Sequence, residues 1–543
     1  MKISEQLVRS VLPSDLGTKI PWRPWLQLAY FLLLISFVLG DCTDFQSVDQ
    51  WLNHGGNLQN QRFAQYENKI NVKSVSRLRI KWTSFIGASV SATASISDGN
   101  LYFPDWDGHL YALAEQTGAV VWKKNLTQLT GSAIAVKSRN TPAVAGELLL
   151  LGLLNPATIL AVRRLDGSLV WSTQLDKHPN AIITMSGTVY NGSFYVGVSS
   201  DEEFANPSIC CTFQGSFQKL DTATGKILWR TIMLPDNFGI RGRYAGAAVW
   251  GSSPAIDVGR NLVYIATGNN YQVPPDVEQC ENNQGNLTMP VVPDPCLAPD
   301  DHSESVVALD LDSGIVKWST HLGGYDAFTA TCLQQPANPN CPTKLGPDYD
   351  FAECPMLITV ASTSGSRDIA VAAQKSGVVW ALDRDTGSIV WSTVAGPGGV
   401  GGGAMWGAAT DGKIVYTNEA NSLQMNFTLL PSTNIINTSA WVAMEASTGR
   451  ILWSTAGPDN VIPVDGPVTI ANGVLLVGSF DQKFAGKLYA LDSRTGQIMW
   501  NATTEAPVLG GFSVSNGCAF IGNGYYTPNY ATGGRRFYAF CVQ

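Results

Sequence analysis

Residues able to do chemistry gather in a few short polar stretches that follow apolar runs. Residues 201–215 carry three acids and two adjacent cysteines, two asparagines follow the apolar run 262–268, and further acids stand in GPDYDF. Carboxylates, amide oxygens, a lysine and aromatic surfaces together suggest a cation-assisted site for a flat ligand. The candidates are Asp201, Glu202, Glu203, Cys210, Cys211, Trp250, Asn269, Asn270, Asp348, Asp350, Lys375 and Trp406.

Each candidate also has a simpler interpretation. Loops are normally rich in acids, and Asn269 and Asn270 tolerate the left-handed backbone of a turn. Lys375 before Ser-Gly fits a turn, and Trp250 and Trp406 precede glycines and fit core packing. The adjacent cysteines are harder to dismiss, because a bond between neighbours closes a strained ring and rarely serves as an ordinary staple. Bonds from each cysteine to a distant partner remain the alternative.

Other chemistries find less support in the sequence. The 5 His include no pair at metal-ligand spacing, which argues against zinc chemistry and a Ser-His-acid triad. No Cys-x-x-Cys-His stretch occurs, so no covalently attached haem is expected. The run GGVGGGAMWG lies between predicted strands and fits a crossover better than a nucleotide-binding loop. The net charge of -8 argues against nucleic acid as a partner.

The elements that position these residues are predicted by a repeated phrase. An apolar stretch such as LYALA or VVALD, a Thr-Gly or Ser-Gly turn, and an apolar strand ending in tryptophan together describe a hairpin of two half-buried strands. Seven complete copies end at Trp122, Trp171, Trp229, Trp318, Trp391, Trp453 and Trp500.

An eighth copy is divided between the two ends of the chain. RRFYAF near the C-terminus repeats the first half of the phrase, and LRIKW ending at Trp82 repeats the second half. A ring closed by its own termini explains both halves, and repeats of a few tens of residues built from strands select a propeller. The predicted fold is therefore all-β, an eight-bladed β-propeller of four-stranded antiparallel blades, with the last blade closed by the strand at Trp82.

Blade topology places the candidate residues on one face of the ring. In a four-stranded blade numbered outward from the axis, the loop between the second and third strands and the crossover to the next blade open on one face, while the Thr-Gly turns lie on the other. Residues 201–215 and Lys375 fall on such loops, whereas Asp348, Asp350 and Trp406 fall on crossovers. We therefore expect these side chains at one axial mouth.

The N-terminus resembles a secretory signal. Residues 26–39 form the apolar run LQLAYFLLLISFVL, which is shorter than a membrane span and is preceded by basic residues. The predicted organisation is a signal peptide, or signal anchor, over residues 1–40, an extension over 41–74 that packs on the ring, and the propeller over 75–543. After signal cleavage no stable membrane span is expected.

Cysteines and sequons also indicate an extracellular protein. The chain has 10 Cys and six Asn-x-Ser/Thr sequons, at Asn125, Asn191, Asn286, Asn426, Asn437 and Asn501. Cys280 with Cys296, and Cys518 with Cys541, are plausible disulfides. Three pairings remain open for the set Cys42, Cys332, Cys341 and Cys354.

With these residues in place, the chain resembles the pyrroloquinoline quinone (PQQ) dependent alcohol dehydrogenases, and within them the polyvinyl alcohol dehydrogenase-like branch. The resemblance runs from WLNHGGNLQNQR at Trp51 to the C-terminus. It depends mainly on SSDEEF followed by CCTFQGS, then WGSSPAI, ATGNNY, GPDYDF and QKSGVVWALDRDTG in this order. The Asp segment does not match the family pattern in one unambiguous register, and no haem domain is appended, so an external electron acceptor would be needed.

The resemblance implies PQQ and Ca²⁺ at the axial mouth. Glu203 or Glu202, with Asn269, would bind the metal. Trp250 would stack on one face of the cofactor and a Cys210–Cys211 disulfide would cover the other, with Trp406 nearby. The general base would be Asp348, with Asp350 as second choice.

The resemblance also implies that Lys375 would stabilise negative charge on the quinone. The function it implies is secreted oxidation of a secondary or polymeric alcohol by hydride transfer to PQQ. The alternative is a non-catalytic glycosylated propeller that acts as a binding or scaffold protein. That view predicts acids that point away from the axis, or distant partners for Cys210 and Cys211.

Overall fold

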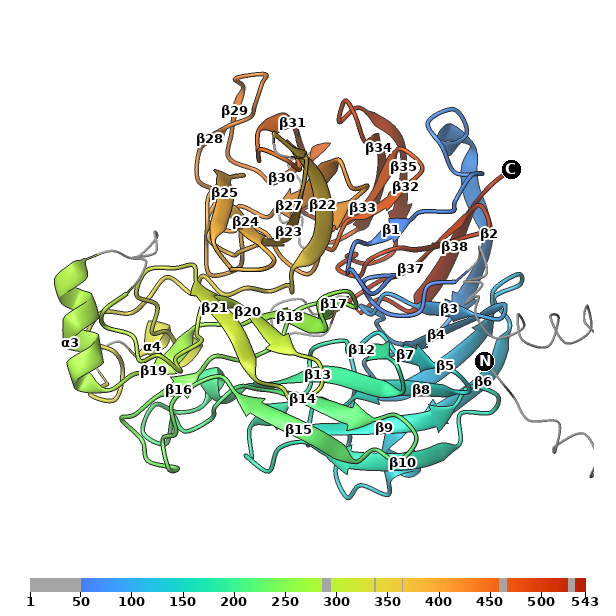
Figure 1. Cartoon of the computed structure of the whole chain (residues 1–543). Coiled ribbons are helices and arrows are strands. Elements are labelled where there is room, and N and C mark those ends of the chain that lie inside the picture. Colours follow the sequence, from blue (N-terminus) through green and yellow to red (C-terminus); the bar gives the residue numbers. More distant parts are fainter. Residues whose placement is uncertain (1–49, 286–293, 336–337, 364, 459–465, 526–532) are drawn as a thin grey trace, which may run out of the picture. The chain divides into compact units, whose positions relative to one another are not determined.

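The computed structural model describes residues 50–285, 294–335, 338–363, 365–458, 466–525 and 533–543. The predicted signal, Cys42 and the sequon at Asn286 lie outside these residues. Within the described part, eight four-stranded antiparallel sheets follow one another around an axis, so the predicted eight-bladed propeller is confirmed (Figure 1). Among the described residues, no helix has the length and apolar character needed to cross a bilayer.

The first four blades take their strands in chain order from the axis outward. Blade 1 contains β3 (Ser95–Ser97), β4 (Asn100–Pro104), β5 (His109–Ala114) and β6 (Val120–Asn125). Blade 2 contains β7 (Ala143–Ala145), β8 (Leu148–Gly152), β9 (Thr158–Arg163) and β10 (Leu169–Gln174). Blade 3 contains β12 (Thr188–Tyr190), β13 (Ser193–Ser200), β14 (Ser216–Asp221) and β15 (Ile227–Ile232), with β11 (Ala181–Ile182) pairing β13. Blade 4 contains β17 (Ala255–Asp257), β18 (Leu262–Ala266), β20 (Ser305–Asp310) and β21 (Val316–His321).

The last four blades repeat this order until the ring closes. Blade 5 contains β22 (Met356–Ser362), β23 (Gly365–Ala373), β24 (Val378–Asp383) and β25 (Ile389–Val394). Blade 6 contains β26 (Ala409–Thr410), β27 (Ile414–Glu419), β30 (Ala440–Glu445) and β31 (Ile451–Ala456). Blade 7 contains β32 (Thr469–Ala471), β33 (Val474–Phe480), β34 (Gly486–Asp492) and β35 (Ile498–Thr504). Blade 8 contains β36 (Ser513–Ser515), β37 (Cys518–Gly522), β38 (Arg536–Val542) and the N-terminal β2 (Leu78–Phe85).

The ring closes as the divided repeat predicts. β2 pairs antiparallel with β38, and Trp82 stands opposite Ala539 (Figure 1). The predicted Cys518–Cys541 disulfide links neighbouring strands of this blade, and the predicted Cys280–Cys296 disulfide also forms. Of the cysteines with open pairing, Cys332 bonds Cys341. Cys354 is a buried free thiol.

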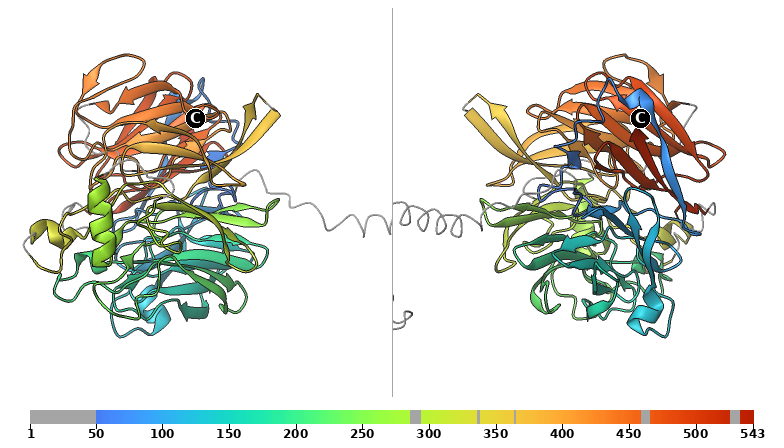
Figure 2. Two further views of the ribbon diagram at one scale, coloured as in Figure 1. Left: turned by 60° about the vertical axis from the view of Figure 1, so that its left-hand side comes forward. Right: turned by 90° about the vertical axis from the view of Figure 1, so that its right-hand side faces the viewer.

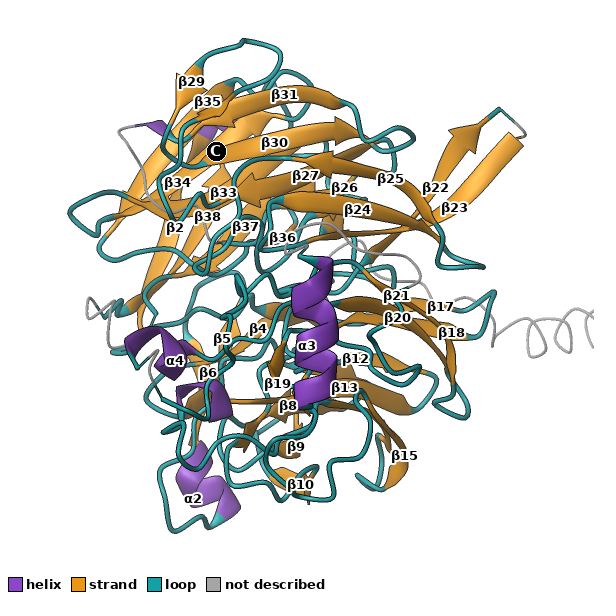
Figure 3. Ribbon diagram, turned by 90° about the vertical axis from the view of Figure 1, so that its left-hand side faces the viewer, coloured by secondary structure: helices purple, strands orange, loops and turns teal. Residues whose placement is uncertain are grey.

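Insertions between the strands build the loops around the mouth. They hold α2 (Leu126–Thr130), α3 (Pro275–Gln284), α4 (Ala330–Gln334) and η2 (Glu202–Phe204) together with the two-stranded sheets β16 (Ala245–Gly246) with β19 (Asn270–Gln272) and β28 (Phe427–Thr428) with β29 (Ile435–Ile436). Figure 3 shows α3 and α4 at the surface of the ring, and in Figure 2 the β22–β23 hairpin extends beyond its neighbours.

The same contact joins every blade to the next. The repeat tryptophan on each outermost strand donates its indole N–H to a backbone carbonyl of the following blade, as Trp391 does to Ala446 at 3.0 Å. Trp500 of blade 7 donates to Leu78 of β2, so the series includes the closing blade. The remaining donors are Trp82, Trp122, Trp171, Trp229, Trp318 and Trp453. Buried aromatic area with a satisfied N–H is what tryptophan supplies to such interfaces.

Residues 51–62, which we name the axial segment, run through the centre of the ring. Before them the chain lies outside the described residues, and after them β1 (Phe63–Ala64) pairs with β32 and η1 (Val75–Arg77) leads into β2. The axial segment hydrogen-bonds to the innermost part of each blade in turn, at Ile96, Val144, Thr188, Ile256, Leu357, Thr410, Ile470 and Phe512. This part of the predicted extension is therefore integral to the ring.

Candidate active site

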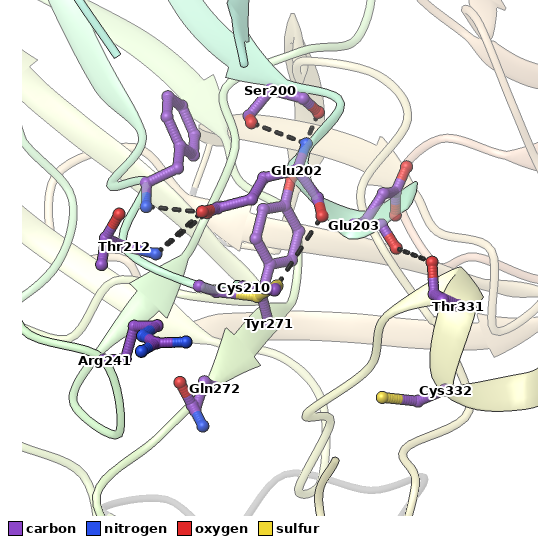
Figure 4. The surroundings of a disulfide bond; sticks show 12 residues. Ser200, Glu202, Glu203, Cys210, Thr212, Arg241, Tyr271, Gln272, Thr331 and Cys332 are labelled. Atoms are coloured by element: carbon purple, nitrogen blue, oxygen red, sulfur yellow. Dashed lines mark hydrogen bonds between the residues drawn. A yellow bond between two sulfur atoms is a disulfide. The ribbon is translucent and has the colours of Figure 1, made fainter. Parts of the chain in front are cut away.

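The two neighbouring glutamates of η2 point in different directions. The Glu202 carboxylate accepts backbone N–H groups of Thr212 and Phe213 at 2.8 to 3.0 Å, whereas Glu203 lies on the other side of the turn, near Thr331 (Figure 4). Glu202 is buried and anchors the 202–213 loop. Of the two acids left open by the sequence, the structure directs only Glu203 into the cavity described below.

Cys210 and Cys211 are bonded to each other, so neither has a distant partner. Both are buried in the core of blade 3 with Phe213 and Tyr271. They are not among the residues that line the cavity within the described chain. Their contact with a cofactor stays a prediction.

Lys375 lies between two aspartates. Its ammonium group is 3.1 Å from both oxygens of Asp348 and 3.4 Å from Oδ2 of Asp350. All three residues are buried. They come from the turn after β23 and from the crossover before β22, as the blade topology predicts.

Asn269 is connected to this group through Asp350. Its backbone N–H donates to Oδ1 of Asp350 at 2.6 Å, and its side-chain amide donates to the carbonyls of Asn270 and Phe328. The side-chain donors are therefore engaged while the amide oxygen is the group left to bind a cation. Asn269 itself is buried and is absent from the cavity lining of the described residues.

A cavity of about 430 Å³ opens beside these residues. The predicted residues that line it are Asp201, Glu203, Trp250, Asp350, Lys375 and Trp406. The two indoles are nearly perpendicular, with ring centroids 5.3 Å apart and an interplanar angle of 87°. Lys375 Nζ lies 5.3 Å from the Trp250 ring centroid, so the cavity combines flat apolar surfaces with charge.

The lining residues that were not predicted as site residues include Trp106, Arg139, Tyr271 and Tyr525. The Arg139 guanidinium lies 4.9 Å from the Trp406 ring centroid and donates to the Tyr525 hydroxyl. It offers the cavity a cation that would suit an anionic ligand group. Arg139 stands in a crossover outside the repeated phrase, within the polar run KSRNT, where Lys137 carries the same charge, so its charge alone does not mark it in the sequence.

The charges around Lys375 do not balance. Burial raises the pKa of Glu203 to about 7, although Lys375 opposes the shift, and burial with the neighbouring acids raises the pKa of Asp348 as well. Burial also disfavours charged Lys375, but the surrounding carboxylates outweigh it and raise its pKa. One ammonium therefore faces the three carboxyl groups of Glu203, Asp348 and Asp350. A divalent cation with oxygen ligands would offset the excess negative charge, so the donor set fits Ca²⁺.

Glu353 ties the site segments together. Its buried carboxylate accepts the N–H of Ala373 at 2.9 Å and that of Ala408 at 2.7 Å. Ala373 precedes Lys375 by two residues and Ala408 follows Trp406 by two, while Glu353 itself follows Asp350 by three. One side chain thus fixes three segments of the cavity wall.

Comparisons with known proteins identify the family and the fold of the chain. The PQQ_2 family, described as outer membrane protein assembly factor BamB, matches residues 71–320 and 437–536. The chain belongs to this family. The match covers most of the ring.

The chain is also similar to individual enzymes of the predicted kind. A polyvinylalcohol dehydrogenase of Pseudomonas sp. is 28% identical, with 85% of this chain and 69% of that protein covered. Another from Sphingopyxis sp. (strain 113P3) is 27% identical, with coverage of 91% and 75%. A europium-containing methanol dehydrogenase has the same fold, with a TM-score of 0.67, 16% identity and coverage of 92% and 99%. The resemblance to quinoprotein alcohol dehydrogenases is confirmed.

Proposed function

We propose that this protein oxidises an alcohol with PQQ as the hydride acceptor and Ca²⁺ as the assisting metal. The observation that carries the proposal is the convergence of Glu203, Asp348, Asp350 and Lys375 beside the cavity that Trp250 lines. Bound PQQ would accept the hydride and bound Ca²⁺ would polarise its quinone oxygen. The rest of the chemistry belongs to the side chains.

Asp348 is the proposed general base. Its carboxylate takes the hydroxyl proton of the alcohol as the carbon-bound hydrogen leaves as hydride, so the alcohol loses two electrons and two hydrogens. Burial raises the pKa of Asp348, whereas Lys375 lowers it and so favours the ionised form that a base requires. Lys375, held 3.1 Å from Asp348, stabilises negative charge that develops beside it.

Glu203 and the amide oxygen of Asn269 are the proposed metal ligands, and Trp250 is the proposed stacking surface. Arg139 would pair with an acidic group of the cofactor, because no carboxylate forms an ion pair with it among the described residues. The relatives named polyvinylalcohol dehydrogenases favour a secondary or polymeric alcohol as substrate. Electrons would leave to an external acceptor.

We also propose that the protein is secreted. The disulfides Cys280–Cys296, Cys332–Cys341 and Cys518–Cys541 suit an oxidising compartment. Mass spectrometry of secreted protein would identify the mature N-terminus near residue 40 and any glycans on the sequons.

The function is tested by reconstitution. Metal-free protein is incubated with PQQ and Ca²⁺, or with Eu³⁺ in place of Ca²⁺, and assayed with 2-propanol, polyvinyl alcohol and a dye acceptor. We expect turnover that requires both PQQ and the metal and falls at least tenfold in Lys375→Met. Lys317→Met, at an ion pair with Asp310 on the outer strands, is the matched control.

A protein that binds no PQQ at micromolar concentration would contradict the proposal. The non-catalytic scaffold would then be the better description. That alternative currently lacks support, because its predicted distant partners for Cys210 and Cys211 do not occur.

A further inference from the structure

A second group of buried oxygen atoms surrounds a small cavity between blade 4 and the α3 insertion. The cavity has a volume of about 10 Å³ and shares no lining residue with the larger one. A volume of this size holds one water-sized sphere. Its oxygen-bearing lining residues are Asn270, Glu281, Ser303, Glu304, Tyr325 and Asp326.

Three of these residues have an oxygen without a partner. Asn270 Oδ1, Glu304 Oε1 and the Tyr325 hydroxyl are buried and accept or donate no hydrogen bond among the described residues. The residues are 5%, 1% and 6% exposed. Buried polar atoms are nearly always satisfied, so three unsatisfied ones on one cavity point to a bound ligand.

Among the described residues no Lys or Arg lines this cavity, and its one basic residue, His321, bonds the Ser303 carbonyl through Nδ1 at 2.8 Å. The other Glu304 oxygen accepts the amide of Gln374 at 2.8 Å, and in the described part of the chain no Lys, Arg or His side chain forms an ion pair with Glu304. The charged groups that act on Glu281 are Asp294 and Asp301, both acids. Carboxylates buried this way are normally paired or coordinate a metal.

We propose that this cavity is a second cation site, which binds Ca²⁺ through the oxygens of Glu304, Asn270 and Asp326, with Glu281 at its edge. Ca²⁺ prefers carboxylate and amide oxygens in an irregular arrangement, and it fits the size of the cavity. The site does not require PQQ, so the inference is independent of the proposed function.

The second site is coupled to the first through Asp326. Its carboxylate accepts the backbone N–H groups of Asp348 at 3.1 Å and of Tyr349 at 2.6 Å. A cation that holds Asp326 in place thereby holds the segment of the proposed base. Loss of the second cation should therefore loosen this segment as well as α3.

Calcium binding to protein without PQQ tests the site. Chelator-treated full-length protein is titrated with Ca²⁺ by calorimetry and with Tb³⁺ by luminescence excited through tyrosine, and melting is recorded in Ca²⁺ and in EDTA. Without PQQ we expect at least one bound equivalent that persists in Glu203→Gln, together with a higher melting temperature in Ca²⁺. Glu304→Gln should weaken the affinity at least tenfold, and Glu281→Gln, at the edge of the site, should do the same without risk to the blade core.

Two variants serve as controls. Glu203→Gln faces the larger cavity, and Glu419→Gln removes another buried carboxylate with an unpartnered oxygen that lines neither cavity. Both variants should keep the Ca²⁺ equivalent assigned to the second site and the higher melting temperature in Ca²⁺. The proposal is overturned if wild-type protein without PQQ binds no Ca²⁺, if Glu304→Gln and Glu281→Gln bind it normally, or if Glu203→Gln abolishes the binding.

Discussion

At the scale of single residues, the direction in which a side chain points decides its role in the site. Glu202 and Glu203 are adjacent, yet one carboxylate holds a backbone loop and the other faces the cavity. The alternation of β13 ends at Ser200, and the 3₁₀ turn that follows rotates successive side chains by about 120°. Sequence therefore predicted the pair but left the choice open.

The two aspartates beside Lys375 should differ in what they do. Asp348→Asn removes the proposed base, so kcat/KM should fall by about 10²–10⁴-fold at any Ca²⁺ concentration. Asp350→Asn disturbs the hydrogen bond to Asn269, so its defect should be relieved by more Ca²⁺. Steady-state rates across a calcium series measure both. If the Asp350 variant stays inactive at saturating calcium and the Asp348 variant does not, then Asp350 is the base and Asp348 supports metal binding.

Glu419 should make stability depend on pH. Burial raises its pKa from 4.5 to about 8, so between these values the folded state keeps a proton that the unfolded state releases. Stability contributed by this group is thus present at low pH and declines as pH rises, by up to about 1.4 kcal/mol per pH unit.

Glu419→Gln should therefore flatten the dependence between pH 5 and pH 8. Urea unfolding at the two values measures it, with Glu147→Gln, an exposed carboxyl, as control. An unchanged slope in the Glu419 variant would show that the unfolding free energy does not depend on its proton.

At the scale of elements, the Thr-Gly turns serve two needs at once. Gly449 has a φ of +72°, and a Cβ there would lie 2.5 Å from Thr393 Oγ1 and from the Trp391 ring. The turn thus receives the indole of the preceding blade, whose N–H bonds Ala446. This double use explains why the phrase in the sequence predicted both the hairpins and their stacking.

Gly449→Ala should destabilise the protein by about 2–4 kcal/mol, from backbone strain and overpacking together. Gly131→Ala isolates the strain, because Gly131 has a φ of +66° and no atom within 4 Å of a Cβ. That control should cost about 1 kcal/mol. Urea unfolding compares them, and equal losses would mean that the contact with Trp391 contributes nothing.

The repeated elements were enough to locate much of the site from the sequence, but not to identify all of its residues. The repeat placed Lys375, Asp348 and Asp350 on loops that open at one mouth, and the structure brings them within 3.4 Å. Arg139 lies in an irregular crossover and Tyr525 in the loop between β37 and β38, and both were missed because such segments carry no periodic pattern. Asp326 was missed because its role depends on contacts far along the chain.

At the scale of the whole molecule, closure depends on both the paired ends and the axial segment. Arg62 is fully buried and donates to the carbonyls of His54, Val468 and Phe512 and to the Thr469 hydroxyl. It therefore joins the axis to blades 7 and 8. Burial lowers its pKa to about 9, partly offset by Glu353.

Arg62→Met should cost about 3–5 kcal/mol, because it leaves buried carbonyls without their donor and removes the positive charge that acts on Glu353. Arg79→Met is the matched control, since exposed Arg79 bonds only carbonyls of its own turn at Ser76 and Leu78. The control should stay within about 0.5 kcal/mol of wild type. Chemical denaturation distinguishes the two variants. Similar losses of unfolding free energy would show that the axial segment has no special role in ring closure.

The order of contacts along the axial segment has a consequence for biosynthesis. Synthesis proceeds from the N-terminus, so residues 51–62 leave the ribosome before any blade and offer a docking edge to each as it emerges. The edge strand β2, however, stays unpaired until β38, the last strand to be synthesised, has been made. A nascent chain can thus assemble its blades progressively, but every chain stalled before residue 536 should expose an unpaired sheet edge to quality-control factors.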